Sequence, residues 1–217
     1  METRDTRQSD AGLPRKEREK AQHRNDILRA AEGLLSKRSY AEIGVQEIAD
    51  AAEFSVGYLY KLFTSKEEIF ESLIREKHEE IGRLLDGFLS QPVGVEERLH
   101  NVVHGIFEWL NRNPAYTSSS VRELMFMSCV LPGYAAEYSL RDAQHSARMK
   151  DLFTEGIRAG FFGKEDPEIM SRTLRALMKG FIQEDLFHGR ERTDWREYAP
   201  VVMRIFMRAF GPEGGRT

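Results

Sequence analysis

Four potential metal ligands recur every four residues in one segment of the chain: Glu96, His100, His104 and Glu108. Residues four apart share one face of a helix, and two histidines at this spacing can bind one metal ion. The same spacing is common on the wet faces of helices, where Glu and His side chains pair with each other. Because the series lies at the edge of an apolar stripe, we expect a solvent-facing series and no metal site.

Other residue types that carry chemistry are sparse. Cys129 is the only cysteine, so the chain can form neither an intramolecular disulfide nor a zinc cluster of paired cysteines, and a reducing compartment is expected. No local motif supports a Ser-His-Asp set or a glycine-rich phosphate loop. We therefore expect no enzymatic activity and no cofactor.

The composition is that of a globular protein in water. The 217 residues are 41% hydrophobic and 31% charged, which is enough to build a core in one large or two modest domains. The net charge of -3 argues weakly against a protein that coats nucleic acid over its whole surface. No apolar run is typical of a signal peptide or a membrane span, so we expect a cytoplasmic protein without a membrane partner.

Positive charge is nevertheless concentrated near the N-terminus. Five basic residues stand there against two glutamates: Arg15, Lys16, Arg18, Lys20 and Arg24. Such a segment could be an arm that touches phosphates, or a solvated leader without a partner. We expect residues 1–20 to form a flexible basic leader.

Helical periodicity dominates the chain, and no stretch alternates as a strand does, which predicts an all-α fold. The spacing predicts helices over 22–37 and about 45–52, and a third helix that begins after a Ser55 cap and ends near Phe63. A capping box of Ser65 and Glu68 opens a fourth helix that ends near Gln91. Further helices are expected at 94–112, 115–130, 134–160, 167–189 and 194–210, before a flexible tail at 212–217.

The second and third predicted helices, with a tight turn between them, have the size of a helix-turn-helix. The run IADAAEFSVGYLYKLF at 48–63, followed by SKEEIF at 65–70, resembles the head of the tetracycline-repressor (TetR) family. The likeness extends roughly from Asn25 to Lys77. It implies a DNA-binding domain at 21–68 and a C-terminal domain at 69–211 that binds a ligand and dimerises.

The start of the third helix is expected to face the major groove, where side chains meet base edges. The resemblance implies phosphate contacts for Tyr60 and Lys66, which position the protein without specifying a sequence. The predicted DNA-binding residues are Val45, Ser55, Val56, Gly57, Tyr58, Tyr60, Lys61 and Lys66.

Some positions depart from the family pattern. Gly44 and Val45 stand where a threonine pair often caps the second helix, and Tyr58 replaces a small hydroxyl residue. Leu62 replaces a polar or aromatic residue. Glu53 occupies a turn position where glycine is frequent, because the left-handed conformation costs other residues ~1 kcal/mol or more. Some phosphate contacts of the family are therefore in doubt, and the operator cannot be transferred.

The last helix is apolar over a wide arc, which predicts burial against two neighbours. Small residues on the preceding helix permit a close approach, so a four-helix dimer seam is expected, with a thick intramolecular core as the alternative. The predicted interface residues are Thr173, Ala176, Gly180, Met203, Phe206, Met207 and Phe210.

A ligand cavity is expected among the fourth to eighth helices. Methionine and aromatic walls suit an apolar or aromatic effector, although most such residues simply pack in a core. The candidate lining residues are Phe107, Tyr116, Met125, Phe126, Cys129, Tyr138, Met149 and Phe181. The resulting hypothesis is a homodimeric repressor that leaves operator DNA when an effector binds. An activator of the same fold and a helical adaptor without DNA binding remain alternatives.

Overall fold

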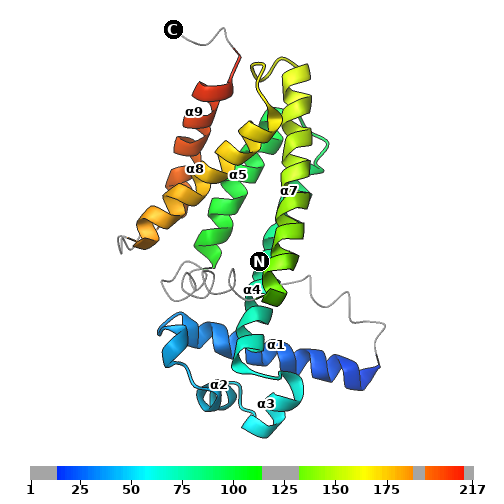
Figure 1. The fold of residues 1–217 in the computed structure, drawn as a ribbon, viewed down its shortest axis with the longest axis vertical. Helices are drawn as coiled ribbons and strands as arrows, with labels where there is room; N and C mark the ends of the chain where they lie inside the picture. Colours follow the sequence, from blue (N-terminus) through cyan, green and yellow to red (C-terminus); the bar gives the residue numbers. More distant parts are fainter. Residues whose placement is uncertain (1–13, 114–131, 188–193, 213–217) are drawn as a thin grey trace.

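The computed structural model describes residues 14–113, 132–187 and 194–212 (Figure 1). Within these ranges the regular structure is entirely helical, which confirms the predicted fold class. The elements are α1 (Arg15–Leu35), η1 (Tyr40–Glu42), α2 (Val45–Ala51), α3 (Val56–Leu62), α4 (Lys66–Leu89), α5 (Val95–Arg112), α7 (Pro132–Arg158), α8 (Pro167–Phe187), η2 (Trp195–Glu197) and α9 (Tyr198–Phe210). The helix predicted at 115–130 lies outside the described residues. None of the described helices is long and apolar enough to cross a membrane.

Helix α1 begins earlier than the sequence predicts. It starts at Arg15, where the Pro14 carbonyl accepts hydrogen bonds from the Glu17 and Arg18 amides. The segment that follows consists of good helix formers, and an Arg15–Glu19 ion pair spans one turn. The expectation of a flexible leader is therefore wrong for residues 15–20, which form two exposed turns of helix.

The head consists of α1, α2, α3 and the first turns of α4 (Figure 1). Its core is closed by fully buried side chains from each helix, including Leu35, Ile48, Leu59 and Phe70. The core continues along α4 as far as Ile74. The head thus extends six residues beyond the predicted boundary at 68, because the apolar start of α4 covers it.

The turn between α2 and α3 contains the left-handed residue that the sequence suggests at position 53. Glu53 adopts a φ of 61°, the left-handed conformation. The next amide, that of Phe54, then donates to the Ala49 carbonyl at 2.9 Å. The chain passes from α2 to α3 through this left-handed residue, and Glu53 adopts the conformation although glycine would do so with less strain.

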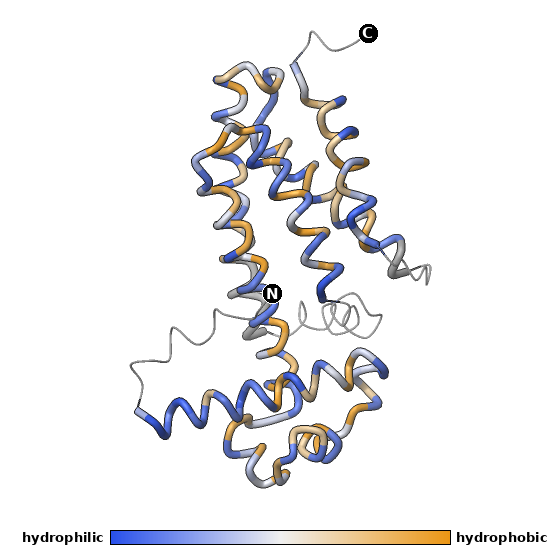
Figure 2. Tube along the Cα trace, turned by 180° about the vertical axis from the view of Figure 1, so that it is seen from behind, coloured by the Kyte–Doolittle hydropathy of each residue, from blue (hydrophilic) through white to orange (hydrophobic). Residues whose placement is uncertain are grey.

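The body packs α5, α7, α8 and α9 around a second core, and α4 connects it to the head (Figure 1). Apolar and polar residues alternate around the body helices, whereas the first turns of α1 are continuously hydrophilic (Figure 2). Phe107, Phe153 and Phe206 are completely buried at the centre of the body. One helix, α4, therefore contributes to both cores and joins them mechanically.

Candidate nucleic-acid interface

The N-terminal end of α3 presents exposed side chains next to a capped backbone. The Ser55 hydroxyl caps the helix by accepting a hydrogen bond from the Tyr58 amide at 3.2 Å, as the sequence predicts. Ser55, Gly57 and Lys61 are exposed, and Tyr60 exposes 50% of its surface. Val45 and Val56 are only partly accessible, because they pack against the head core. The structure thus brings four of the eight predicted residues to one free helix surface.

Tyr58 is held toward α1. Its hydroxyl lies 2.7 Å from Nδ1 of His23, and its ring packs against Phe54 with centroids 5.3 Å apart. His23 also contacts the Phe54 ring at 4.9 Å. The sequence offers no local signal for His23, because 35 residues separate it from Tyr58. The aromatic trio fixes α3 against α1 and thereby orients the exposed end of α3.

Lys66 has intramolecular partners. Its ammonium donates to the Tyr40 carbonyl at 2.6 Å and lies 4.1 Å from the centroid of the Tyr40 ring. Burial lowers the pKa of Lys66. Burial and the nearby carboxylate of Glu67, which accepts a hydrogen bond from the Tyr40 hydroxyl, raise the pKa of Tyr40 to about 12. A phosphate contact by Lys66 remains a prediction, and it would compete with the Tyr40 carbonyl.

Arg24 has a structural role. Its guanidinium donates to the Leu62 carbonyl at 2.7 Å and to the Ser72 hydroxyl at 2.8 Å, and it lies 4.0 Å from the Phe63 ring centroid. These contacts join α1 to the end of α3 and to α4. Arg24 therefore does not belong to the basic arm in which its sequence position places it.

Glutamates complete the caps at the starts of α2 and α4. With no threonine at position 44, the Gly44 amide donates to the Glu47 carboxylate at 2.8 Å, and Arg38 pairs with the same carboxylate. At the start of α4, Ser65 accepts from the Glu68 amide as predicted, whereas the Glu68 carboxylate accepts from Thr64. The second half of the predicted capping box is thus shifted by one residue.

Three predicted ligand-lining residues belong to the body core. Phe107 is fully buried, Met149 is nearly so, and Phe181 stacks on Tyr198 with a centroid distance of 4.8 Å. The remaining candidates, Tyr116, Met125, Phe126 and Cys129, lie outside the described residues. Tyr138 is in α7, but its side chain is outside the described part as well.

One predicted interface residue is incorrect. Phe206 is completely buried within a single chain, where its ring packs 5.4 Å from that of Phe153. It cannot also contact a second subunit. Met203, Met207 and Phe210 pack partly against the same core. The large apolar residue that α9 exposes is instead Ile205, with 39% of its surface accessible.

The possible metal ligands of α5 have other neighbours. The His100 and His104 rings stack with centroids 3.8 Å apart, and burial lowers the pKa of His104. Glu108 pairs with Arg112 at 2.8 Å and with Arg196 at 3.7 Å. Among the described residues, no three potential ligands converge on one point.

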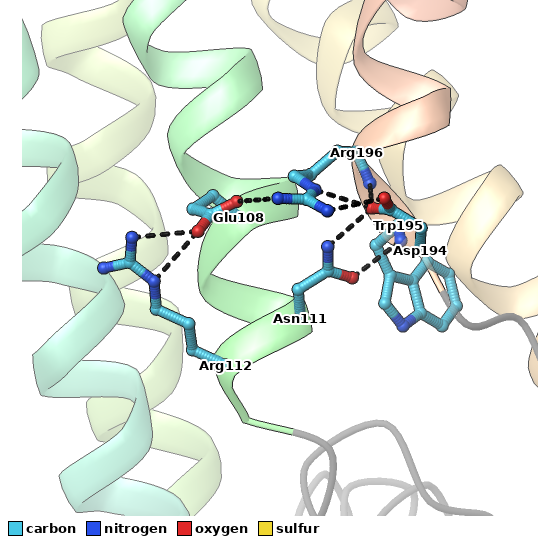
Figure 3. A network of polar contacts seen from close by, with 6 residues as sticks. All are labelled: Glu108, Asn111, Arg112, Asp194, Trp195 and Arg196. Atoms are coloured by element: carbon cyan, nitrogen blue, oxygen red, sulfur yellow. Dashed lines mark hydrogen bonds and ion pairs between the residues drawn. The ribbon is translucent and has the colours of Figure 1, made fainter.

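Glu108 belongs to a polar network that ties the end of α5 to η2, directly before α9 (Figure 3). The Asn111 amide donates to Asp194 and accepts from the Trp195 backbone, both at 2.7 Å. Hydrogen bonds from Arg196 hold the pKa of Asp194 well below its usual range. The network fixes α5 against η2, the short helix that leads into α9.

Comparisons with known proteins agree with the head's geometry. The sequence model of the TetR family of bacterial regulatory proteins matches residues 27–73. An HTH-type transcriptional regulator of Mycobacterium tuberculosis is 26% identical over 170 residues, which cover 78% of each chain. The repressor KstR of Rhodococcus jostii is 30% identical over 48% of this chain and 49% of its own.

The whole fold also has a solved counterpart. The regulator FadR from Bacillus subtilis, crystallised with stearoyl-CoA, superposes with a TM-score of 0.67 at 17% identity, over 83% of this chain and 96% of FadR. The likeness shows a shared architecture of head and helical body. Residues 27–73 thus form a head of the TetR type, and the chain as a whole is similar to transcriptional regulators of that family.

Proposed function

We propose that the protein is a homodimeric repressor that binds a specific operator and leaves it when an apolar effector enters the body. The observation that carries the proposal is the exposed N-terminal end of α3, held by the His23–Tyr58 contact on a rigid three-helix head. A helix presented in this way fits the major groove of DNA. The name of the relative KstR, a transcriptional repressor, supports the sign of regulation.

A stripe on α8 supports the dimer. Ile169, Thr173, Ala176 and Gly180 follow the i, i+4, i+7, i+11 spacing, so they share one face of the helix. Ile169 is 48% exposed, and a side chain at Gly180 would meet no neighbour. Because α8 packs beside α9, this stripe and Ile205 can form one apolar surface. A second copy that covered it would place two heads at a fixed separation, as paired half-sites require.

The effector class rests on the body core. Its aromatic and methionine side chains suit a largely apolar molecule. The FadR complex with stearoyl-CoA provides a precedent in the same fold. An effector that favours the state unable to bind DNA can shift binding only by its difference in affinity for the two states.

DNA binding is the decisive test. A duplex selected by the protein from a random-sequence library is titrated by fluorescence anisotropy with the wild type, Tyr60→Ala, Lys61→Ala and the control Ala147→Ser on α7. Each of the first two variants removes an exposed group of α3, so we expect about a tenfold loss for a lost contact worth 1–2 kcal/mol. Ala147→Ser should bind as the wild type does. Failure to select any sequence would favour the adaptor alternative and overturn the proposal.

Effector release is tested on the assembled complex. Stearoyl-CoA is titrated into the protein–duplex complex, with coenzyme A as the control that lacks the acyl chain. We expect release of the duplex and a higher melting temperature over the same range of concentration, because binding and release are linked. Equal effects of the two molecules would contradict an apolar site. Loss of repression in a reporter strain on deletion of the gene would identify a repressor, whereas loss of expression would identify an activator.

A further inference from the structure

The first turns of α1 form a helical extension of the head. The first completely buried residue of α1 is Ile27, twelve residues after the helix begins at Arg15. At 1.5 Å per residue this leaves about 18 Å of helix before the core. Figure 1 shows this end of α1 reaching past α3, and Figure 2 shows that it is mostly hydrophilic.

One face of the extension continues toward α3. Lys16, Lys20, His23 and Ile27 follow the i, i+4, i+7, i+11 spacing and therefore share a face. His23 identifies which face this is, because its ring nitrogen lies 2.7 Å from the Tyr58 hydroxyl on α3. Lys20 lies about 5 Å and Lys16 about 10 Å farther along the same face, measured along the helix axis.

The charges on this face are available to a ligand. Lys16 and Lys20 are exposed, and within the described residues neither forms an ion pair or a side-chain hydrogen bond. Of the two glutamates in the extension, Glu19 pairs with Arg15 at 2.7 Å. Arg18 is two residues from each lysine, which is 200° around the helix, so it lies on the opposite side.

We propose that this face of α1 is a second DNA contact, in which Lys16 and Lys20 bind phosphates that flank the base pairs read by α3. The proposal rests on the proposed DNA binding. Its ligand is the phosphodiester backbone, because two lysines on a rigid helix can neutralise phosphates without reading bases. The His23–Tyr58 contact fixes the angle between the extension and α3, so that both can contact one duplex at the same time.

The test compares two double variants of equal charge. Lys16→Gln/Lys20→Gln removes the two charges on the face that continues toward α3. Arg15→Gln/Arg18→Gln removes two charges elsewhere on the same turns. Both are titrated as full-length protein against the selected duplex at several salt concentrations. We expect the lysine variant to bind at least tenfold more weakly. Its salt slope should fall by about 3.6, since the two heads of a dimer together lose four phosphate contacts and each contributes about 0.9. The arginine variant should keep the wild-type slope.

A shortened duplex provides the second measurement. Removal of the flanking base pairs should weaken the wild type and leave the lysine variant unchanged, because that variant has already lost the flanking contact. If both double variants bound the duplex equally weakly, the effect would come from the overall positive charge of the helix end, and the proposal would be overturned. Unchanged binding by the lysine variant would also overturn the proposed second contact. The proposed function would still stand in that case, because the wild-type protein would still bind the duplex. If the wild type bound no duplex, both proposals would fail.

Discussion

Glu76 is a single residue whose charge opposes folding. It lies in α4 close to the junction of head and body, and burial raises its pKa, with further contributions from Glu32 and Glu80. Lys77, its neighbour in sequence, acts in the opposite direction but does not cancel the effect of burial. The folded protein therefore binds a proton at Glu76 more readily than the unfolded chain does.

The substitution Glu76→Gln should raise the melting temperature at pH 7. An acid whose pKa is raised by folding lowers the free energy of unfolding as the pH rises from its ordinary pKa near 4.5, and the loss persists at neutral pH. Glutamine removes that loss because it carries no charge. At pH 4, where most of the carboxyl is protonated in either state, the advantage should largely disappear. Calorimetry at pH 4 and pH 7 measures the difference in melting temperature between the variant and the wild type. An equal gain at the two pH values would rule out the charge as the cause.

At the scale of elements, α4 is joined to the body by close helix packing. Gly105 of α5 faces Phe88 of α4 so closely that an added Cβ would lie 2.1 Å from the Phe88 ring. Only a residue without a side chain allows this approach. A contact of another kind lies nearer the head, where Lys77 pairs with Glu32 of α1 at 3.0 Å and donates to Asn113 beyond α5 at 3.3 Å.

Gly105→Ala should destabilise the protein by about 1–3 kcal/mol, because the methyl group displaces the Phe88 ring from a packed position. Gly87→Ala on α4 is the matched control, since its new methyl group meets nothing within 4 Å. That variant should gain up to ~1 kcal/mol from the better helix propensity of alanine. Urea unfolding of the two proteins provides the comparison. A Gly105 variant as stable as its control would mean that Phe88 repacks without cost.

At the scale of the whole molecule, the proposed dimer depends on the α8 stripe. Ala176→Asp would place an unpaired charge in the seam, at a cost of roughly 3 kcal/mol, which corresponds to a dimer dissociation constant about 150-fold higher. Ala147→Asp adds the same charge to an exposed helix position of α7 and should leave the dimer intact. Sedimentation equilibrium measures both. Unchanged association of the Ala176 variant would place the interface on another surface.

Local sequence alone determined much of the head. The Ser55 cap, the turn at Glu53 and the start of α4 at Ser65 follow from residue type and short spacing, because a helix end is closed by residues within one turn. The spacing of apolar residues likewise determined the all-helical fold of the described ranges.

Tertiary structure decided which faces and partners these helices use. A wide apolar arc on α9 could not show that Phe206 faces its own chain and Ile205 faces solvent, since both belong to the same arc. Basic sequence around Arg24 could not separate a residue that joins three helices from lysines that form no ion pair with any described residue. The contact between His23 and Tyr58 joins residues 35 positions apart. Such choices depend on how helices pack across the chain, and no local pattern records that packing.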